Sequence, residues 1–179
     1  MARSRLYTVL PIIFFTQCGY TFDCVPFYDS TNKYNLEFGV AELGTEVIVV
    51  ADLLGRNSNC YESEDKKYID CEYFDDSGVS YTVEGTRILK KEIKSENLSK
   101  LDRQPFNLSY TDHFQDAVKK FHNLDNELPN WTILYDENDI VLASDFCFKN
   151  KNGNLFSLSL TFNSETLRLE KIISRLNWQ

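Results

Sequence analysis

The sequence Asn152-Gly-Asn-Leu-Phe-Ser-Leu-Ser-Leu-Thr-Phe162 decides the fold class of this protein, because apolar and polar residues alternate through its second half. Phenylalanine and leucine form one face (Phe156, Leu158, Leu160 and Phe162), and serine and threonine form the other. This period of two residues is typical of a β-strand with one buried face. Asn152-Gly153 is a strong signal for a two-residue hairpin turn. The sequence therefore predicts a hairpin that leads into a half-buried strand at 155–162.

Other segments with strand character lie on both sides of this hairpin. They are residues 131–135 and 140–148 in the second half, and 68–74, 79–83 and 87–93 in the first half. The three early segments predict a meander with a polar turn at 75–78. The closing stretch 167–176 is also rich in apolar residues, but its periodicity does not decide between a strand and a helix.

Each half also holds one stretch whose apolar residues recur with the helical spacing i, i+3, i+4, i+7. These are Val47, Val50, Ala51 and Leu54 in the first half, and Phe114, Ala117, Val118 and Phe121 in the second. Thr45 is a candidate N-cap for the first helix, and Ser109 to Asp112 resembles a capping box before the second. The β-branched run at 47–50 favours a strand instead. We interpret the first stretch as a helix.

The two halves share the order of their elements. Cys71 and Cys147 each stand in a strand that is followed by aromatic residues, a polar turn and a glycine, at Gly78 and Gly153. We therefore predict an α+β fold in which two similar modules, each a short helix followed by an antiparallel β-meander, form one compact domain. The predicted ranges are an N-terminal arm at 18–34, a first module at 35–97, a polar linker at 98–109 and a second module at 110–179. Chance similarity of two hairpins is the alternative.

The first residues have the pattern of an export signal. Arg3 and Arg5 precede the apolar run 6–15, which is too short to cross a bilayer as a helix and has the flanks of a signal peptide. Cys18 follows the run and resembles the lipidated cysteine of a bacterial lipobox; ordinary cleavage nearby is the alternative. We predict that residues 1–17 are a signal peptide. The expected location is the periplasm, with an outer-membrane anchor at Cys18, or alternatively outside the cell.

Both processing routes leave four cysteines able to pair, namely Cys24, Cys60, Cys71 and Cys147. Four cysteines allow three connectivities. Cys60 and Cys71 flank a polar segment that is expected to double back, so we predict that they pair. Cys24 then remains for Cys147.

The composition argues against several classes of function. The formal net charge is −8, whereas a nucleic-acid-binding face needs clustered cations, so we expect no nucleic acid as partner. The two histidines, His113 and His122, would point to opposite sides of one helix and could not share a metal ion. The motifs of serine hydrolases, zinc proteases and redox-active cysteine pairs are missing from the sequence. We predict a protein that is not an enzyme and uses no cofactor.

An acidic and aromatic segment between residues 61 and 76 is the candidate partner-binding surface. This segment contains seven carboxylates and only two lysines, with tyrosines between them. Carboxylates can set the register of a complex with a basic partner, and aromatic rings supply contact area. A solvated hairpin rim is the alternative. The candidate residues are Tyr61, Glu62, Glu64, Asp65, Tyr68, Asp70, Glu72, Tyr73, Asp75 and Asp76. The partner that they favour is a protein with a basic cleft.

One stretch of the first module resembles a known family. Gly44-Thr-Glu-Val47 and Leu53-Leu-Gly55, followed by the meander with its Asp/Gly turn, look like the small outer-membrane lipoprotein domain of the BamE/SmpA type. Two such units in tandem are the architecture of the β-lactamase inhibitor protein, so the resemblance implies a duplicated helix-and-sheet fold. We expect an exported protein of the immunity or inhibitor type that blocks a secreted toxin or hydrolase. The alternative is a structural lipoprotein of envelope assembly.

Overall fold

The computed structural model describes residues 26–27, 34–55, 59–62, 69–122, 131–136, 138–144 and 147–177. Its strands are β1 (Pro26–Phe27), β2 (Asn59–Glu62), β3 (Ile69–Phe74), β4 (Val79–Glu84), β5 (Arg87–Lys94), β6 (Trp131–Tyr135), β7 (Asp139–Ser144), β8 (Cys147–Lys149), β9 (Leu155–Asn163) and β10 (Leu169–Leu176). The α-helices are α1 (Val47–Val50) and α2 (Phe114–His122), and two 3₁₀ helices are η1 (Ser95–Lys100) and η2 (Pro105–Asn107). The protein is a compact, mostly antiparallel β-sheet domain with few helices, as the sequence predicted in outline.

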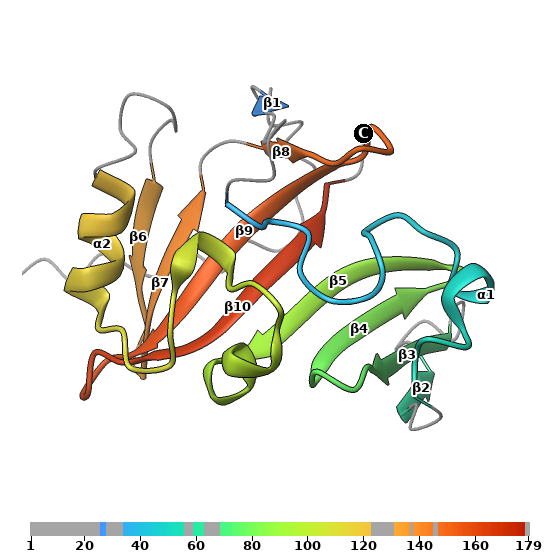
Figure 1. The fold of residues 1–179 in the computed structure, drawn as a ribbon, viewed down its shortest axis with the longest axis horizontal. Helices are drawn as coiled ribbons and strands as arrows, with labels where there is room; N and C mark the ends of the chain where they lie inside the picture. Colours follow the sequence, from blue (N-terminus) through green and yellow to red (C-terminus); the bar gives the residue numbers. More distant parts are fainter. Residues whose placement is uncertain are drawn as a thin grey trace, which may run out of the picture.

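All the described strands belong to one sheet, in the order β1-β8-β9-β10-β5-β4-β3-β2, while β7 pairs with β9 and β6 pairs with β7 (Figure 1). Only β1 and β8 pair in parallel among the described strands. The antiparallel contact between β5 and β10 joins the early strands to the late ones. The early meander β3-β4-β5 was predicted correctly.

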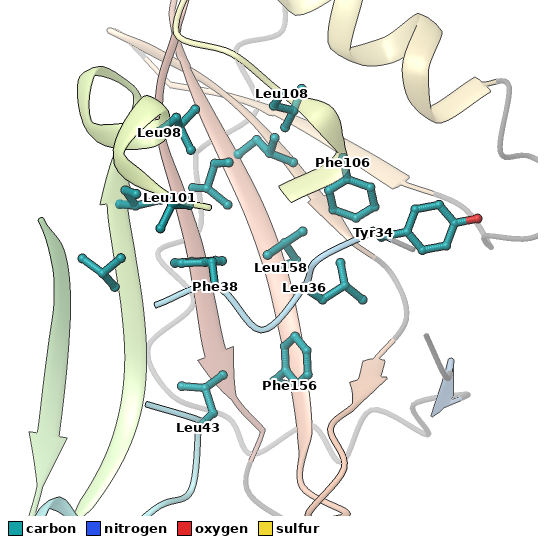
Figure 2. Packing of buried hydrophobic residues seen from close by; sticks show 14 of the residues in the cluster. Tyr34, Leu36, Phe38, Leu43, Leu98, Leu101, Phe106, Leu108, Phe156 and Leu158 are labelled. Atoms are coloured by element: carbon teal, nitrogen blue, oxygen red, sulfur yellow. The ribbon is translucent and has the colours of Figure 1, made fainter. Parts of the chain in front are cut away.

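One face of the sheet, which we call the covered face, carries the hydrophobic core. Its side chains follow the period of two that the sequence predicted, so that Phe156, Leu158, Leu160 and Phe162 are all buried. An extended segment, residues 34–44, crosses this face; we call it the strap. Figure 2 shows Leu36, Phe38 and Leu43 of the strap close to Phe156 and Leu158 of β9. The segment 98–109 also packs here, through Leu98, Leu101, Phe106 and Leu108.

The opposite face, which we call the open face, is polar. Strand pairing places Lys90, Glu92 and Lys94 of β5 on it, beside Lys171, Ile173 and Arg175 of β10. On the other side of β10, the strand β9 presents Ser157, Ser159 and Thr161 there. An antiparallel sheet with one packed and one polar face is the common arrangement for strands of alternating sequence.

The helix predicted at 45–54 is much shorter in the structure. Only Val47–Val50 is helical, and a turn leads from there to the buried Leu54. The prediction of Thr45 as N-cap was wrong: Glu46 holds that position, with no side-chain cap. The physical reason is a β-bridge between Glu46 and Arg87, which keeps the backbone extended up to the first helical residue.

Each α-helix begins beside the start of a later strand. Two backbone hydrogen bonds fix each junction. At the start of α1, Val47 N–H donates to Thr86 O (2.8 Å) and Ile88 N–H donates to Thr45 O (3.0 Å). At the start of α2, Phe114 N–H donates to Leu167 O (2.8 Å) and Leu169 N–H donates to Asp112 O (3.1 Å). The predicted capping box does form a bond from Ser109 N–H to the Asp112 carboxylate (3.0 Å). Because α2 begins only at Phe114, this bond closes the turn before the helix rather than its first turn.

Two strand predictions also needed correction or completion. The segment 140–148, predicted as one strand, is divided into β7 and β8, which pair with different parts of β9. The ambiguous stretch 167–176 is the strand β10, because it fills the place between β5 and β9.

The predicted disulfide between Cys60 and Cys71 is present and joins directly opposite residues of β2 and β3. Cys147 is also disulfide-bonded. Its predicted partner Cys24, the predicted lipidation site Cys18 and the signal peptide 1–17 lie outside the described residues. No helix in the described parts of the chain is long and apolar enough to span a membrane.

Candidate interaction surface

The hairpin of β2 and β3 forms one end of the sheet, beyond β4 (Figure 1). Cys60 pairs with Cys71 in the register of the two strands, so the disulfide closes the hairpin across the sheet edge. A cross-link of this kind restricts the unfolded chain and holds a short edge strand against its neighbour. The hairpin is thus a rigid platform for the residues beside it.

The structure describes part of the predicted partner surface. Glu64, Asp65 and Tyr68 lie outside the described residues, and only the backbone is described for Tyr61, Glu62 and Asp70. Glu72 is half-buried on the open face, and Asp76 is exposed in the following turn. Tyr73 packs against the core on the covered face, because it pairs with the buried Tyr81.

Asp75 was predicted to lie on the partner surface, but it is buried and its carboxylate accepts hydrogen bonds within the fold. It accepts hydrogen bonds from Ser77 N–H (3.0 Å), Val79 N–H (3.0 Å) and the hydroxyls of Ser77 and Tyr81 (both 2.6 Å). These bonds close the β3–β4 turn, in which Gly78 has a positive φ of 82°. Burial, followed by the bond to Asp75, raises the pKa of the Tyr81 phenol well above its usual range.

The strap lies so close to the sheet that only glycine fits at one of its positions. A Cβ atom at Gly39 would lie 2.1 Å from the Tyr81 hydroxyl oxygen, and the residue has φ of 83°. The neighbouring Val40 donates its N–H to that same oxygen at 2.8 Å. The turn carboxylate of Asp75, the Tyr81 hydroxyl and the strap backbone therefore form one connected polar group.

A second buried polar contact holds the strap from the next strand. The Lys91 side chain is fully buried, and its Nζ donates to Phe38 O (2.9 Å), Ala41 O (3.1 Å) and Glu37 Oε2 (3.2 Å). Burial lowers the pKa of Lys91, while the charge of Glu37 acts in the opposite direction. Three acceptors match the three N–H donors of an ammonium group. Lys91 is the latch that fastens the strap over the sheet.

The strap leads directly into α1, whose outer side is apolar. Ile48, Val49 and Leu53 are 79%, 73% and 58% exposed. Val47 and Val50 are partly buried against the core, so both sides of this short helix carry large apolar groups. The Gly55 N–H donates to Phe74 O (2.7 Å), which fixes the end of the helical turn to the end of β3. Figure 1 shows α1 beside the hairpin.

We call Ile48, Val49 and Leu53 the apolar ridge. It was missed from the sequence, because the helical spacing was used only to find the inward positions of this helix. The available signal was that Ile48, Val49 and Leu53 fall outside that spacing and are nevertheless apolar.

The described residues show no arrangement typical of metal chemistry: no three His, Cys, Asp or Glu side chains among them could hold a metal ion. The buried ionisable groups form hydrogen bonds within the fold: Asp75 with the β3–β4 turn and Tyr81, and Lys91 with the strap. His113 lies before α2, in a β-bridge with Arg168. What remains available on this end of the molecule is a surface for contact with another molecule.

No protein-family model, curated protein or solved structure matches the chain.

Proposed function

We propose that this protein is an exported, non-enzymatic binding protein that blocks a secreted toxin or hydrolase, and that the apolar ridge and the β2–β3 hairpin form the contact surface. The apolar ridge is the observation that carries the proposal. Three large apolar side chains on the short helix α1 and the turn that follows it are costly to leave in water, and each can contribute about 1.5–3 kcal/mol when a partner buries it. Such clusters on stable proteins mark interaction sites.

The surroundings of the ridge favour a basic partner. The exposed Asp76 lies in the turn that follows the hairpin, and the segment between β2 and β3 adds further acids in the sequence. An apolar centre with a charged rim is the usual anatomy of a protein interface. The acidic rim steers a partner whose binding cleft is basic.

The ridge is held in place before any partner arrives. The Lys91 latch and the Tyr81 hydroxyl fix the strap that precedes α1, and the Gly55 bond fixes the end of the turn that follows it. The hairpin is closed by the Cys60–Cys71 disulfide. A surface that is ordered in advance loses less conformational entropy on binding.

We also propose that the domain is a duplication of one helix-plus-meander unit. Support comes from the sheet order, in which β2-β3-β4-β5 meets β10-β9-β7-β6 with β5 and β10 at the centre. The junction of α1 with β5 and the junction of α2 with β10 have matching backbone hydrogen bonds. The two residues on the helix side of the first junction lie 67 positions before their equivalents in the second (Thr45 to Asp112 and Val47 to Phe114). The two residues on the strand side lie 81 positions before theirs (Thr86 to Leu167 and Ile88 to Leu169). This arrangement fits tandem units of the BamE/SmpA type.

Export remains part of the proposal. Disulfide bonds persist in oxidising compartments and are rare in the cytosol. Cys60, Cys71 and Cys147 are all disulfide-bonded, which supports a periplasmic or secreted location. Mass spectrometry of the mature protein should show that residues 1–17 or slightly more have been removed. A full-length mature chain would contradict this part of the proposal.

A matched pair of leucines tests the contact surface. Leu53 on the ridge and Leu134 on β6 are 58% and 54% exposed. Leu53→Asp should weaken binding to a secreted hydrolase or toxin that co-purifies with the protein by about 10- to 100-fold, mainly through faster dissociation. Leu134→Asp should leave the kinetics unchanged. Equal effects of the two variants, or none from Leu53→Asp with an intact fold, would move the interface away from α1.

A further inference from the structure

The centre of the open face carries cations in an unfavourable arrangement. On the antiparallel pair of β5 and β10, Lys94 stands directly opposite Lys171, and Lys90 stands directly opposite Arg175. Side chains in such positions have Cβ atoms about 5 Å apart, and like charges there destabilise a sheet. We call these four residues the cationic seam.

Little in the described structure neutralises the seam. Glu92 lies between the two pairs and bonds Lys90 at 3.3 Å. Lys94, Lys171 and Arg175 form no ion pair with any described residue. The chain has 27 acidic and 19 basic residues, so acids to pair with these cations are plentiful in the sequence. Stability alone does not explain why this central position keeps three unpaired cations.

The shape of the surface also suits a partner. Ile173 lies between the two pairs on β10, and β9 beside it has only small side chains on this face, the half-buried Ser157 and Ser159 and the buried Thr161. The two cation pairs are four residues apart along the strands, which corresponds to about 13 Å. An extended segment with carboxylates at i and i+4 and an apolar residue at i+2 would place all three side chains on one side, facing the seam and Ile173.

We propose that the open face is a second docking surface, which binds an acidic protein segment through the cationic seam. A protein segment fits better than a nucleic acid or an anionic membrane. Glu72 and Glu84 lie on the same face in the neighbouring strands β3 and β4. These carboxylates would repel an extended polyanion, while a short segment with two carboxylates avoids them. The proposal is independent of the apolar ridge, which belongs to the covered side of the sheet.

The test uses the purified, isotope-labelled protein and the peptide acetyl-Glu-Thr-Val-Thr-Glu-amide, followed by NMR titration. The backbone amides of 90–94 and 171–175 should shift, and the affinity should fall as salt is added. The isomeric peptide acetyl-Glu-Glu-Thr-Val-Thr-amide, with its carboxylates on opposite sides, should bind about fivefold more weakly.

Variants separate the seam from general charge effects. Lys94→Glu/Lys171→Glu should weaken binding of the first peptide at least about tenfold. Lys100→Glu/Lys119→Glu makes the same change in net charge on η1 and α2, and should leave the affinity unchanged. Lys94→Ser/Lys171→Ser should also lose binding while remaining at least as stable as the original protein, because it removes an opposed pair of like charges.

Several outcomes would overturn the proposal. These are shifts confined to residues outside the open face, equal loss of binding in the two charge-reversal variants, and tighter binding of a short oligothymidylate or of vesicles containing phosphatidylglycerol. Binding at the seam with no effect of Leu53→Asp would uphold the second surface. Hydrolase binding that depends on Leu53 but not on Lys94 or Lys171 would leave the proposed function intact and is expected if the two surfaces are separate.

Discussion

Lys90 and Lys91 are neighbours on β5 and have opposite surroundings. Lys91 points to the covered face, is fully buried and gives its three protons to Glu37 and two strap carbonyls. Lys90 points to the open face, where its partner is Glu92 and an arginine stands opposite. The comparison shows that strand alternation decides the role of each charge: one lysine fastens the fold, and its neighbour belongs to a surface that a partner can reach.

Substitution of each lysine in turn has the largest expected effect. Lys91→Met should lower the free energy of unfolding by about 3–5 kcal/mol, because the Glu37 carboxylate and the strap carbonyls lose their common donor. Lys90→Met should cost less than about 1 kcal/mol, as for other ion pairs near the surface. Urea denaturation of both variants provides the measurement. Similar losses would show that the covered and open faces do not differ in this way.

The second test concerns the edge of the sheet, where the Cys60–Cys71 disulfide joins β2 to β3. Cys71 lies on the covered face but is only half-buried, and Cys60 is exposed. Cys60→Ser/Cys71→Ser should lower the free energy of unfolding by about 3 kcal/mol, the value expected for a short closed loop. Amide hydrogen exchange in β2 and β3 should become faster, while exchange in β9 and β10 follows only the global change. Unchanged exchange in β2 would contradict the role of the disulfide.

Tyr81 gives the smallest effect and the one that depends on pH. Tyr81→Phe removes a hydrogen bond to a buried carboxylate and should cost about 2 kcal/mol at neutral pH. Because the folded protein raises the pKa of this phenol above the ordinary value of 10.0, the unfolded chain loses the proton first. The stabilisation is therefore complete below about pH 10 and is lost as the pH rises further.

Denaturation between pH 9 and about pH 11 checks this prediction. The original protein should lose more stability over that range than Tyr81→Phe does. Tyr135→Phe is the control, since Tyr135 is 74% exposed and should leave the pH dependence of the original protein unchanged. Parallel curves for the original protein and Tyr81→Phe would show that Tyr81 is not linked to folding.

The sequence was sufficient for features that depend on neighbouring residues. Alternation in 155–162 predicted β9, because a strand exposes its residues to two faces in turn, and the meander proposed at 68–74, 79–83 and 87–93 predicted β3, β4 and β5. The pairing of Cys60 with Cys71 followed from the polar segment between them. The position of Lys91 in phase with the buried Ile93 was also a readable signal of an inward lysine.

Contacts between distant segments decided the rest. Lys91 is buried as a cation only because Glu37, 54 residues earlier, arrives with the strap. Asp75 has the same local pattern as the other acids of the segment 61–76, but its hydrogen bonds with Tyr81 and the turn amides bury it. The apolar ridge and the cationic seam likewise exist only in the assembled sheet, since a sequence shows which residues share a strand face but not which strands meet or what covers them. Local sequence patterns were therefore sufficient for β3, β4, β5 and β9 and for the two-sided pattern of β9. Tertiary packing decided which side was sealed by the strap and which charges remained available for binding.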